Sequence, residues 1–250
     1  MKKVKKQLSK ILSLSQAEKL NKNNEVEQNT ADFSDFEKEI IKKTNNFTMT
    51  SSERIVSLIR ATEYVIKNNI EGSIVECGVW KGGSIMAVLH TLNQLKKEKD
   101  VFLYDTFEGM TYPTDEDFSV KKQQSAKEIY VDKNGVMCYS SLEEVQSNIQ
   151  SVDYNKDHIH FIKGKVEDTI PDHNTPEKIA LLRLDTDWYE STKHEMEHLF
   201  PRLEKGGIII IDDYGHWSGC KKAVDEYLDK NNIPLFLSRI DYTCRIGVKM

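Results

Sequence analysis

Residues 179–187 have the sequence IALLRLDTD, an apolar run that ends at two acidic residues, Asp185 and Asp187. Residues 207–213, GIIIIDD, repeat this arrangement and end at two adjacent aspartates. Short continuous apolar runs are typical of parallel strands that are buried on both faces of a sheet. Ligands of open α/β sheets bind beyond the carboxyl ends of such strands. The sequence therefore predicts a ligand site where these acidic clusters meet.

Three or four carboxylates at one edge of a sheet would repel one another unless a cation lay between them. Hard divalent cations such as Mg²⁺ prefer oxygen ligands of this kind. The two acidic clusters therefore indicate a metal site at the mouth of an α/β sheet.

Apolar runs of strand length alternate with helical segments from residue 51 to the end of the chain. This alternation predicts one doubly wound, Rossmann-like α/β domain. Only residues 241–243 separate the last two predicted strands, a connection too short for a parallel crossover, so we expect an antiparallel C-terminal strand. The expected strands span residues 73–78, 100–105, 158–162, 179–184, 208–211, 235–240 and 244–248. One expected helix begins at Ser51 or Ser52, and four more span residues 84–95, 142–149, 189–203 and 220–230.

The chain divides into an N-terminal extension, residues 1–50, and a domain, residues 51–250. We expect a frayed, solvated tail at the start of the extension. A short amphipathic helix is the alternative, because apolar side chains between Val4 and Leu12 recur at helical spacing. Residues 106–140 are polar and irregular in sequence. A connection of that length is usually functional, so we expect a lid.

Composition and charge favour a cytoplasmic protein that does not bind nucleic acid. The formal net charge is −5 and the pI is about 5.9, which gives no basis for nucleic-acid binding. The four cysteines are scattered without a C-x-x-C pair, which argues against a zinc site and against a disulfide framework. No apolar run approaches the roughly 20 residues of a transmembrane helix, and the basic start of the chain lacks the apolar core of a signal peptide.

A glycine-rich turn, residues 76–84 (ECGVWKGGS), joins the first predicted strand to its helix. It is neither the G-x-G-x-x-G of dinucleotide-binding folds nor the G-K-[ST] of phosphate-binding loops. Glu76 places a carboxylate at the end of the first strand, which favours a cationic ligand over a pyrophosphate. Asp105 ends the second strand, where an acid accepts hydrogen bonds from ribose hydroxyls. The turn therefore favours adenosylmethionine, which carries a sulfonium and no phosphate, over NAD.

Several motifs occur in the order in which one known family has them. They are VECGVWKGGS (75–84), YDTFEGM (104–110), SLEEV (141–145), FIKG (161–164), EDTIP (167–171), LDTDWYEST (184–192) and DDYG (212–215). Through these motifs the chain, from about residue 50 onwards, resembles the macrocin O-methyltransferase (TylF) family, whose members methylate sugar hydroxyls. Thr186 and Trp188 depart from that family, which often has glycine and methionine at these positions.

The resemblance implies a class I methyltransferase fold, adenosylmethionine as the methyl donor and Mg²⁺ as a cofactor. It assigns the metal to Asp185, Asp212 and Asp213. It also implies a homo-oligomer, and an acceptor that is a small molecule or a glycan with vicinal hydroxyls. The residues that it implies for donor binding are Glu76, Gly78, Val79, Gly82, Ser84, Asp105, Thr106, Phe107, Gly109, Gly164 and Asp185.

A metal that binds two neighbouring sugar hydroxyls would lower the pKa of the attacking one. We expect Asp185 to accept the proton, with Asp187 as the second choice and His216 as a further base or substrate contact. The same aspartates would also suit a catechol-like diol. A non-catalytic protein that keeps the fold is another alternative, but intact acids at all three metal positions argue against it. The missing G-x-G-x-x-G disfavours an NAD-dependent sugar enzyme.

Overall fold

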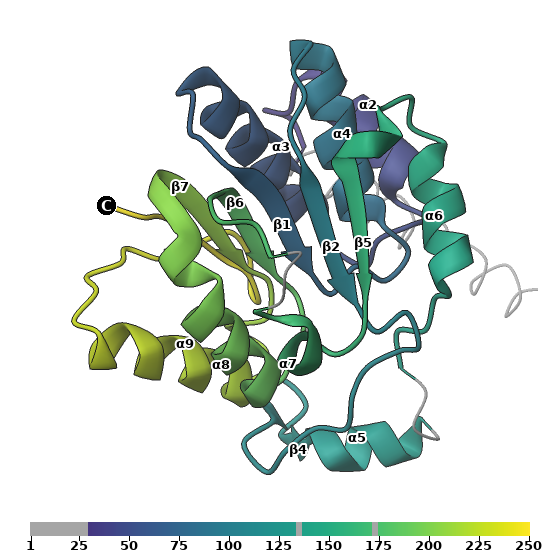
Figure 1. The fold of residues 1–250 in the computed structure, drawn as a ribbon. Coiled ribbons are helices and arrows are strands. Elements are labelled where there is room, and N and C mark those ends of the chain that lie inside the picture. Colours follow the sequence, from purple (N-terminus) through teal and green to yellow (C-terminus); the bar gives the residue numbers. More distant parts are fainter. Residues whose placement is uncertain (1–29, 134–136, 172–174) are drawn as a thin grey trace, which may run out of the picture. The chain divides into compact units, whose positions relative to one another are not determined.

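The structure of the protein is a computed structural model that describes residues 30–133, 137–171 and 175–250. The chain forms two compact units, residues 1–39 and residues 40–250. The main sheet and all the predicted site residues belong to the second unit (Figure 1).

The described part of the first unit contains the start of helix α2 (Asp35–Thr44), which continues into the second unit. A reciprocal cap begins this helix. The backbone N–H of Glu37 donates to Ser34 Oγ at 3.2 Å, and the backbone N–H of Ser34 donates to Glu37 Oε2 at 2.7 Å. This capping box satisfies two backbone donors that the helix itself leaves unpaired. The segment between Val4 and Leu12, expected to be a frayed tail or alternatively a short helix, lies outside the described residues.

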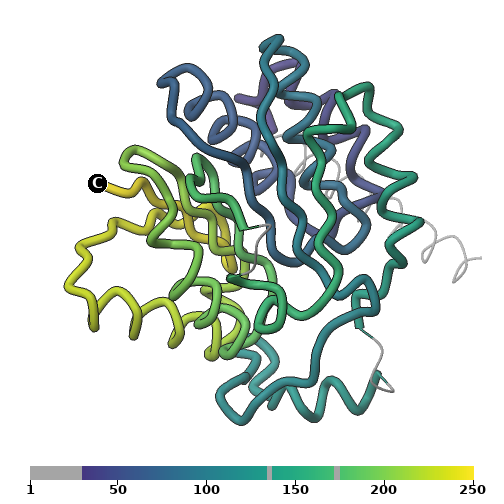
Figure 2. Tube along the Cα trace, in the orientation of Figure 1, coloured from purple at the N-terminus to yellow at the C-terminus, as the bar shows by residue number. Residues whose placement is uncertain are grey.

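The second unit is built on a seven-stranded sheet with the strand order β5-β2-β1-β6-β7-β9-β8. The first five strands are parallel, and β9 runs antiparallel between β7 and β8. Figure 2 shows the chain leaving β7, passing through α9 and returning beside β7 as β9. The predicted doubly wound fold with an antiparallel C-terminal strand is therefore confirmed. The strands are β1 (Ser73–Cys77), β2 (Val101–Asp105), β5 (Ile159–Lys163), β6 (Ile179–Leu184), β7 (Leu203–Ile211), β8 (Ser238–Arg239) and β9 (Arg245–Val248).

Each face of the sheet has its own apolar core, because successive residues of a strand point to opposite faces. Ile74 belongs to the core shared with α3, α4 and α6, whereas its neighbour Val75 belongs to the core shared with α7, α8 and α9 (Figure 1). The described helices include none with the length and apolar character needed to cross a bilayer. The helices are α3 (Ser52–Lys67), α4 (Gly83–Leu95), α6 (Leu142–Gln150), α7 (Val166–Thr169), α8 (Tyr189–His198) and α9 (Ser218–Lys230).

The largest boundary error concerns the helix predicted over residues 189–203. In the structure α8 ends at His198, a 3₁₀ turn follows at Phe200–Arg202, and β7 begins directly afterwards. Pro201 accounts for the break, because proline has no backbone N–H to continue an α-helix. The strand is consequently longer than the predicted 208–211.

The prediction that residues 106–140 are irregular is wrong for part of that segment. A small hairpin pairs β3 (Phe118–Ser119) with β4 (Gln124–Ser125), and helix α5 (Ala126–Asp132) follows at once. Two-residue strands show no alternation that a sequence pattern could reveal. The helix begins at the N-cap Ser125, a local signal in the sequence that the prediction of an irregular lid did not take into account.

Asp117 fixes this segment to the rest of the second unit, and only 1% of its surface is exposed. Its Oδ2 accepts hydrogen bonds from the backbone N–H and the hydroxyl of Thr114, at 2.7 and 2.8 Å. Its Oδ1 accepts one from the backbone N–H of Tyr189, at the start of α8, at 2.8 Å. A Cβ atom on Gly219 would lie 1.9 Å from this Oδ1. One buried carboxylate therefore ties the segment to the beginnings of α8 and α9.

Candidate functional site

A cavity of about 480 Å³ lies at the carboxyl ends of the parallel strands, where the sequence predicted a ligand site. Three predicted donor-binding residues are not part of its wall. Glu76 is buried, Gly82 packs against α6, and Phe107 belongs to an apolar core. The predicted residues that line the cavity are Gly78, Val79, Ser84, Asp105, Thr106, Gly109, Gly164, Asp185, Asp187, Asp212, Asp213 and His216.

The three predicted metal ligands converge on the cavity wall. Asp185, Asp212 and Asp213 each offer a carboxylate oxygen, and these atoms lie within 4.8 Å of one another. They meet because they follow β6 and β7, which are adjacent parallel strands. The Oδ2 atom of Asp213 is buried and has no hydrogen-bond partner among the described residues. Burial, together with the neighbouring Asp187 and Asp212, raises the pKa of Asp213 well above its ordinary value.

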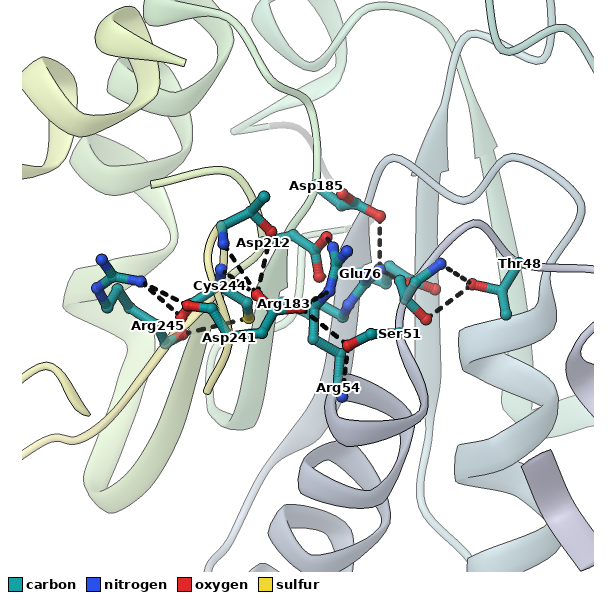
Figure 3. A network of polar contacts seen from close by, with 12 residues as sticks. Thr48, Ser51, Arg54, Glu76, Arg183, Asp185, Asp212, Asp241, Cys244 and Arg245 are labelled. Carbon is teal, nitrogen blue, oxygen red and sulfur yellow. Dashed lines mark hydrogen bonds and ion pairs between the residues drawn. The ribbon is translucent and has the colours of Figure 1, made fainter. Parts of the chain in front are cut away.

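Two arginines neutralise part of this negative charge (Figure 3). Arg183 of β6 is 3% exposed; its Nη2 donates to Asp212 Oδ1 at 2.7 Å, and its Nη1 lies 2.8 Å from Asp185 Oδ2. Arg54 of α3 binds the other oxygen of Asp212, and its Nε lies 2.9 Å from Asp241 Oδ2. Sequence reasoning missed both arginines. A charged residue inside a strand buried on both faces was nevertheless a signal, because such residues are seldom buried without a partner.

Glu76 was predicted to contact the donor, but the structure places it inside the fold. Its carboxylate is 1% exposed and binds Nη1 of Arg183, the residue paired with it on the adjacent strand (Figure 3). Alternation along β1 puts Glu76 on the same face as Ile74, which packs in the core with α3. Burial raises the pKa of Glu76 to about 7, against the opposing effect of Arg183. Glu76 therefore neutralises Arg183 instead of lining the donor site.

Asp105 shapes the glycine-rich turn. Its Oδ2 accepts hydrogen bonds from the backbone N–H groups of Val79, at 2.6 Å, and Trp80, at 3.0 Å. Its Oδ1 accepts one from the backbone N–H of Phe107 at 2.7 Å. The carboxylate predicted to bind ribose hydroxyls therefore also holds two loops together. The hydroxyl of Thr106 donates a fourth, long hydrogen bond to Oδ1 at 3.4 Å. Because an ionised carboxylate has about four acceptor positions, a ligand hydroxyl would have to replace this long bond.

Two glycines of the turn are required for different reasons. Gly78 has a φ of 83°, and a Cβ atom there would lie 2.1 Å from the carbonyl oxygen of Asp185. Gly82 has a φ of 87°, and its Cβ atom would lie 2.9 Å from Ile149 of α6. Gly78 therefore lets β1 end directly beside the aspartate cluster. Gly82 serves the packing of a helix.

Asp187 and His216, the other candidates for proton transfer, both line the cavity. Asp187 has a φ of 67°, and burial followed by the charge of Asp185 raises its pKa to about 7. His216 shares hydrogen bonds with Ser119 Oγ, at 3.3 Å from Nε2, and with the hydroxyl of Tyr242, at 3.2 Å from Nδ1. Burial lowers the pKa of His216. Among these two, Asp187 is therefore the group that can exchange a proton near neutral pH.

Known proteins resemble this chain over most of its length. The profile of the macrocin-O-methyltransferase (TylF) family matches residues 2–247. The 8-demethyl-8-(2,3-dimethoxy-alpha-L-rhamnosyl)-tetracenomycin-C 4'-O-methyltransferase of Streptomyces olivaceus is 35% identical over 199 residues, which cover 78% of this chain and 73% of that protein. The demethyldecarbamoylnovobiocin O-methyltransferase of Streptomyces niveus is 33% identical over 199 residues, with coverages of 79% and 73%.

The fold comparison agrees with the sequence comparison. The structure of the O-methyltransferase NovP matches this one with a TM-score of 0.72 and 30% sequence identity, over 82% of each chain. The family profile spans nearly all of the chain, and the relatives exceed 30% identity over more than two thirds of it. The chain therefore belongs to the macrocin O-methyltransferase (TylF) family of adenosylmethionine-dependent methyltransferases.

Proposed function

We propose that the protein transfers a methyl group from adenosylmethionine to a hydroxyl group of a sugar, with the participation of Mg²⁺. The observation that supports this best is the meeting of Asp185, Asp212 and Asp213 on a cavity that also includes the glycine-rich turn. A sugar hydroxyl needs activation at neutral pH, and a carboxylate cluster offers both a cation site and proton acceptors. We choose a sugar because the Streptomyces olivaceus relative is named for a reaction on a rhamnosyl compound.

The composition of the aspartate cluster fits a hard divalent cation. Its ligand atoms are carboxylate oxygens, and the buried Asp213 Oδ2 has no partner in the described residues. Burying an unpartnered charged group is costly, and a cation would remove that cost. Arg54 and Arg183 already bind the two oxygens of Asp212, and Arg183 also binds one oxygen of Asp185. Asp213 is therefore the most available ligand, followed by Asp185. When bound, a divalent cation supplies Lewis-acid polarisation of a hydroxyl oxygen.

We place the donor at the end of the cavity formed by β1, β2 and β5. Gly78, Ser84, Asp105 and Gly164 line this end. Ser84 lies in the first turn of α4, whose N-terminus has no side-chain cap. A helix N-terminus of this kind suits a carboxylate such as that of methionine. Adenosylmethionine supplies an electrophilic methyl group on a sulfonium.

The chain's own residues would align the acceptor hydroxyl, exclude water and take up a proton. Asp185 is our first choice as proton acceptor because it lies on the wall beside the glycine-rich turn, with Asp187 second and His216 third. Met110 and Trp217 add apolar surface to the same wall, which limits the water around the acids. Alignment of two reactants in one cavity is itself a large part of the rate enhancement.

Binding and methyl transfer together test the proposed function. Calorimetry measures adenosylmethionine binding, and mass spectrometry detects methyl transfer to a panel of glycosides, nucleotide sugars and catechols, with Mg²⁺ or with a chelator. We expect a sugar to be methylated, and the reaction to stop in chelator. Transfer to catechols alone would replace the sugar by a catechol-like diol. Absence of adenosylmethionine binding would indicate a non-catalytic protein.

A matched pair of variants tests the aspartate cluster itself. Asp213→Asn removes a proposed metal ligand and is expected to lower methyl transfer by at least about 100-fold, while adenosylmethionine still binds. Asp229→Asn makes the same chemical change at an exposed position of α9 and is expected to have no effect. Full activity of Asp213→Asn, or of the unaltered protein in chelator, would contradict a role for the metal.

A further inference from the structure

The wall of the cavity changes its charge between β6 and β9. Asp185 and Asp213 lie on the side of β6 and β7. Beyond β7, the wall is formed by Lys121, His216 and Tyr242. His216 follows β7, and Tyr242 lies in the connection between β8 and β9. A ligand that fills the cavity would therefore contact both an acidic and a basic surface.

Lys121 belongs to the β3–β4 turn, which the fold holds in place. The backbone N–H of Val120 donates to the carbonyl oxygen of His216 at 3.0 Å. The backbone N–H of Phe118 donates to Ser218 Oγ at 3.0 Å, and an isolated β-bridge lies between these two contacts. Lys121 consequently follows directly on three residues that are fixed to the segment between β7 and α9, and it lines the cavity there.

No carboxylate among the described residues forms an ion pair with the ammonium group of Lys121. It lies 5.9 Å from the centre of the Tyr242 ring, and in the part of the chain that the structure describes no ion pair joins Lys121 or Lys122 to an acid. Arg54, by contrast, is bound by two carboxylates and is already neutralised. An unpaired cation on the wall of a cavity favours a ligand that brings negative charge, because charge-assisted hydrogen bonds are strong.

His216 supports Tyr242 at the same end of the cavity. Its two ring nitrogens lie within hydrogen-bond distance of Ser119 Oγ, at 3.3 Å, and of the hydroxyl of Tyr242, at 3.2 Å. The hydroxyl of Tyr242 can still exchange a second hydrogen bond with a ligand, and Lys121 gives this end of the cavity its positive charge. This positive end contrasts with the aspartate cluster and with the net charge of −5 of the whole chain.

We propose that Lys121 and the hydroxyl of Tyr242, which His216 holds in place, bind an anionic group of the acceptor, so that the acceptor is a sugar carrying a phosphate or a carboxylate. The inference rests on the proposed function, which places the sugar hydroxyls at the aspartate cluster. The donor does not account for this surface, because its only negative group is the carboxylate that we place at α4. A neutral glycoside would leave Lys121 without a partner.

Calorimetry with small probes tests this surface without knowledge of the natural sugar. The probes are pyrophosphate, glucose 1-phosphate, glucuronate and glucose, each titrated into protein saturated with S-adenosylhomocysteine. We expect at least one anionic probe to bind about 10-fold or more tightly than glucose, and its affinity to fall with added salt. Preference for glucose 1-phosphate identifies a phosphate as the anionic group, and preference for glucuronate identifies a carboxylate.

Variants of Lys121 assign the binding to this side chain. Lys121→Gln should weaken the anionic probe about 10-fold or more, Lys121→Arg should largely preserve it, and Lys205→Gln, at an exposed position near the opposite end of β7, should change nothing. Adenosylmethionine should bind all three variants equally. The inference is overturned if no anionic probe binds more tightly than glucose, or if Lys121→Gln leaves its affinity unchanged. If the unaltered protein does not bind adenosylmethionine, the proposed function itself is contradicted.

Discussion

Replacing Arg183 by methionine should destabilise the second unit by several kcal/mol. The guanidinium of Arg183 lies between Glu76, Asp185 and Asp212, and both Arg183 and Glu76 are almost completely buried. Methionine would fill much of the volume but would leave these carboxylates without their shared cation. Removing one member of a buried ion pair costs about 3–5 kcal/mol. Arg54 still binds Asp212, so the loss falls mainly on Glu76 and Asp185.

Urea unfolding followed by circular dichroism measures this effect. With a dependence on denaturant of about 2 kcal/mol per molar urea, the midpoint should fall by about 1.5–2.5 M. The melting temperature should fall by about 6–20 °C for a domain of this size. Arg239→Met, an exposed change on the edge strand β8, serves as the control. Glu76→Gln in the Arg183→Met background should restore part of the loss. A loss below about 1 kcal/mol would refute the reasoning, because buried carboxylates would then not depend on this cation.

Three further predictions concern single side chains. Gly78→Ala should lower stability by about 2–4 kcal/mol and abolish adenosylmethionine binding in calorimetry, because its Cβ would lie 2.1 Å from the Asp185 carbonyl; normal binding would contradict this. Burial raises the pKa of Glu195 well above 4.5, so the free energy of unfolding of the unaltered protein should fall as the pH rises above that value. Glu195→Gln should make the free energy of unfolding depend less on pH between about pH 5 and pH 8, and an unchanged pH dependence would contradict the prediction. The hydrogen bond with Asp100 raises the pKa of His158 above 6.5, so this pair should stabilise the fold by less than about 1 kcal/mol at its exposed position, fully below pH 6.5 and no longer once the pH has risen through the shifted value. His158→Gln should abolish this change of melting temperature with pH, and an unchanged pH dependence would mean that the pair contributes nothing.

The position of the site could be predicted because it depends on where strands end. Asp185 and Asp212 each follow an apolar run whose length and composition mark it as a buried strand. In a parallel sheet the carboxyl ends of neighbouring strands lie at the same edge, so their side chains must meet there. The same reasoning located the turn at Gly78 and the acid at Asp105. Local sequence thus determined which groups face the cavity from the strands.

The counter-ions could not be predicted, because they come from distant parts of the chain. Arg54 is 158 residues from Asp212 in sequence, and no periodicity in α3 indicates which carboxylate it reaches. Glu76 was misplaced for a different reason. Its position at the end of β1 was weighed, but not the alternation that turns it to the face where Arg183 lies. Two charged residues in two buried strands were the signal for a pair, and that signal was available in the sequence.

The charges of the site also indicate how folding and ligand binding are linked. Glu76, which lies off the cavity wall, is paired with Arg183 through one oxygen, whereas Asp213 lies on that wall. Each of these two carboxylates also has one buried oxygen without a partner among the described residues. The arginine therefore stabilises the fold while it lowers the negative charge that a cation would meet. Arg183→Met should consequently weaken the fold and strengthen its response to Mg²⁺. A ligand that binds only the folded state raises stability by an amount that grows with the logarithm of its affinity. Saturating Mg²⁺ should therefore raise the melting temperature of Arg183→Met more than that of the unaltered protein. Equal shifts in the two proteins would mean that Arg183 and the cation do not share the carboxylates, and the metal would then have to be sought elsewhere on the cavity wall.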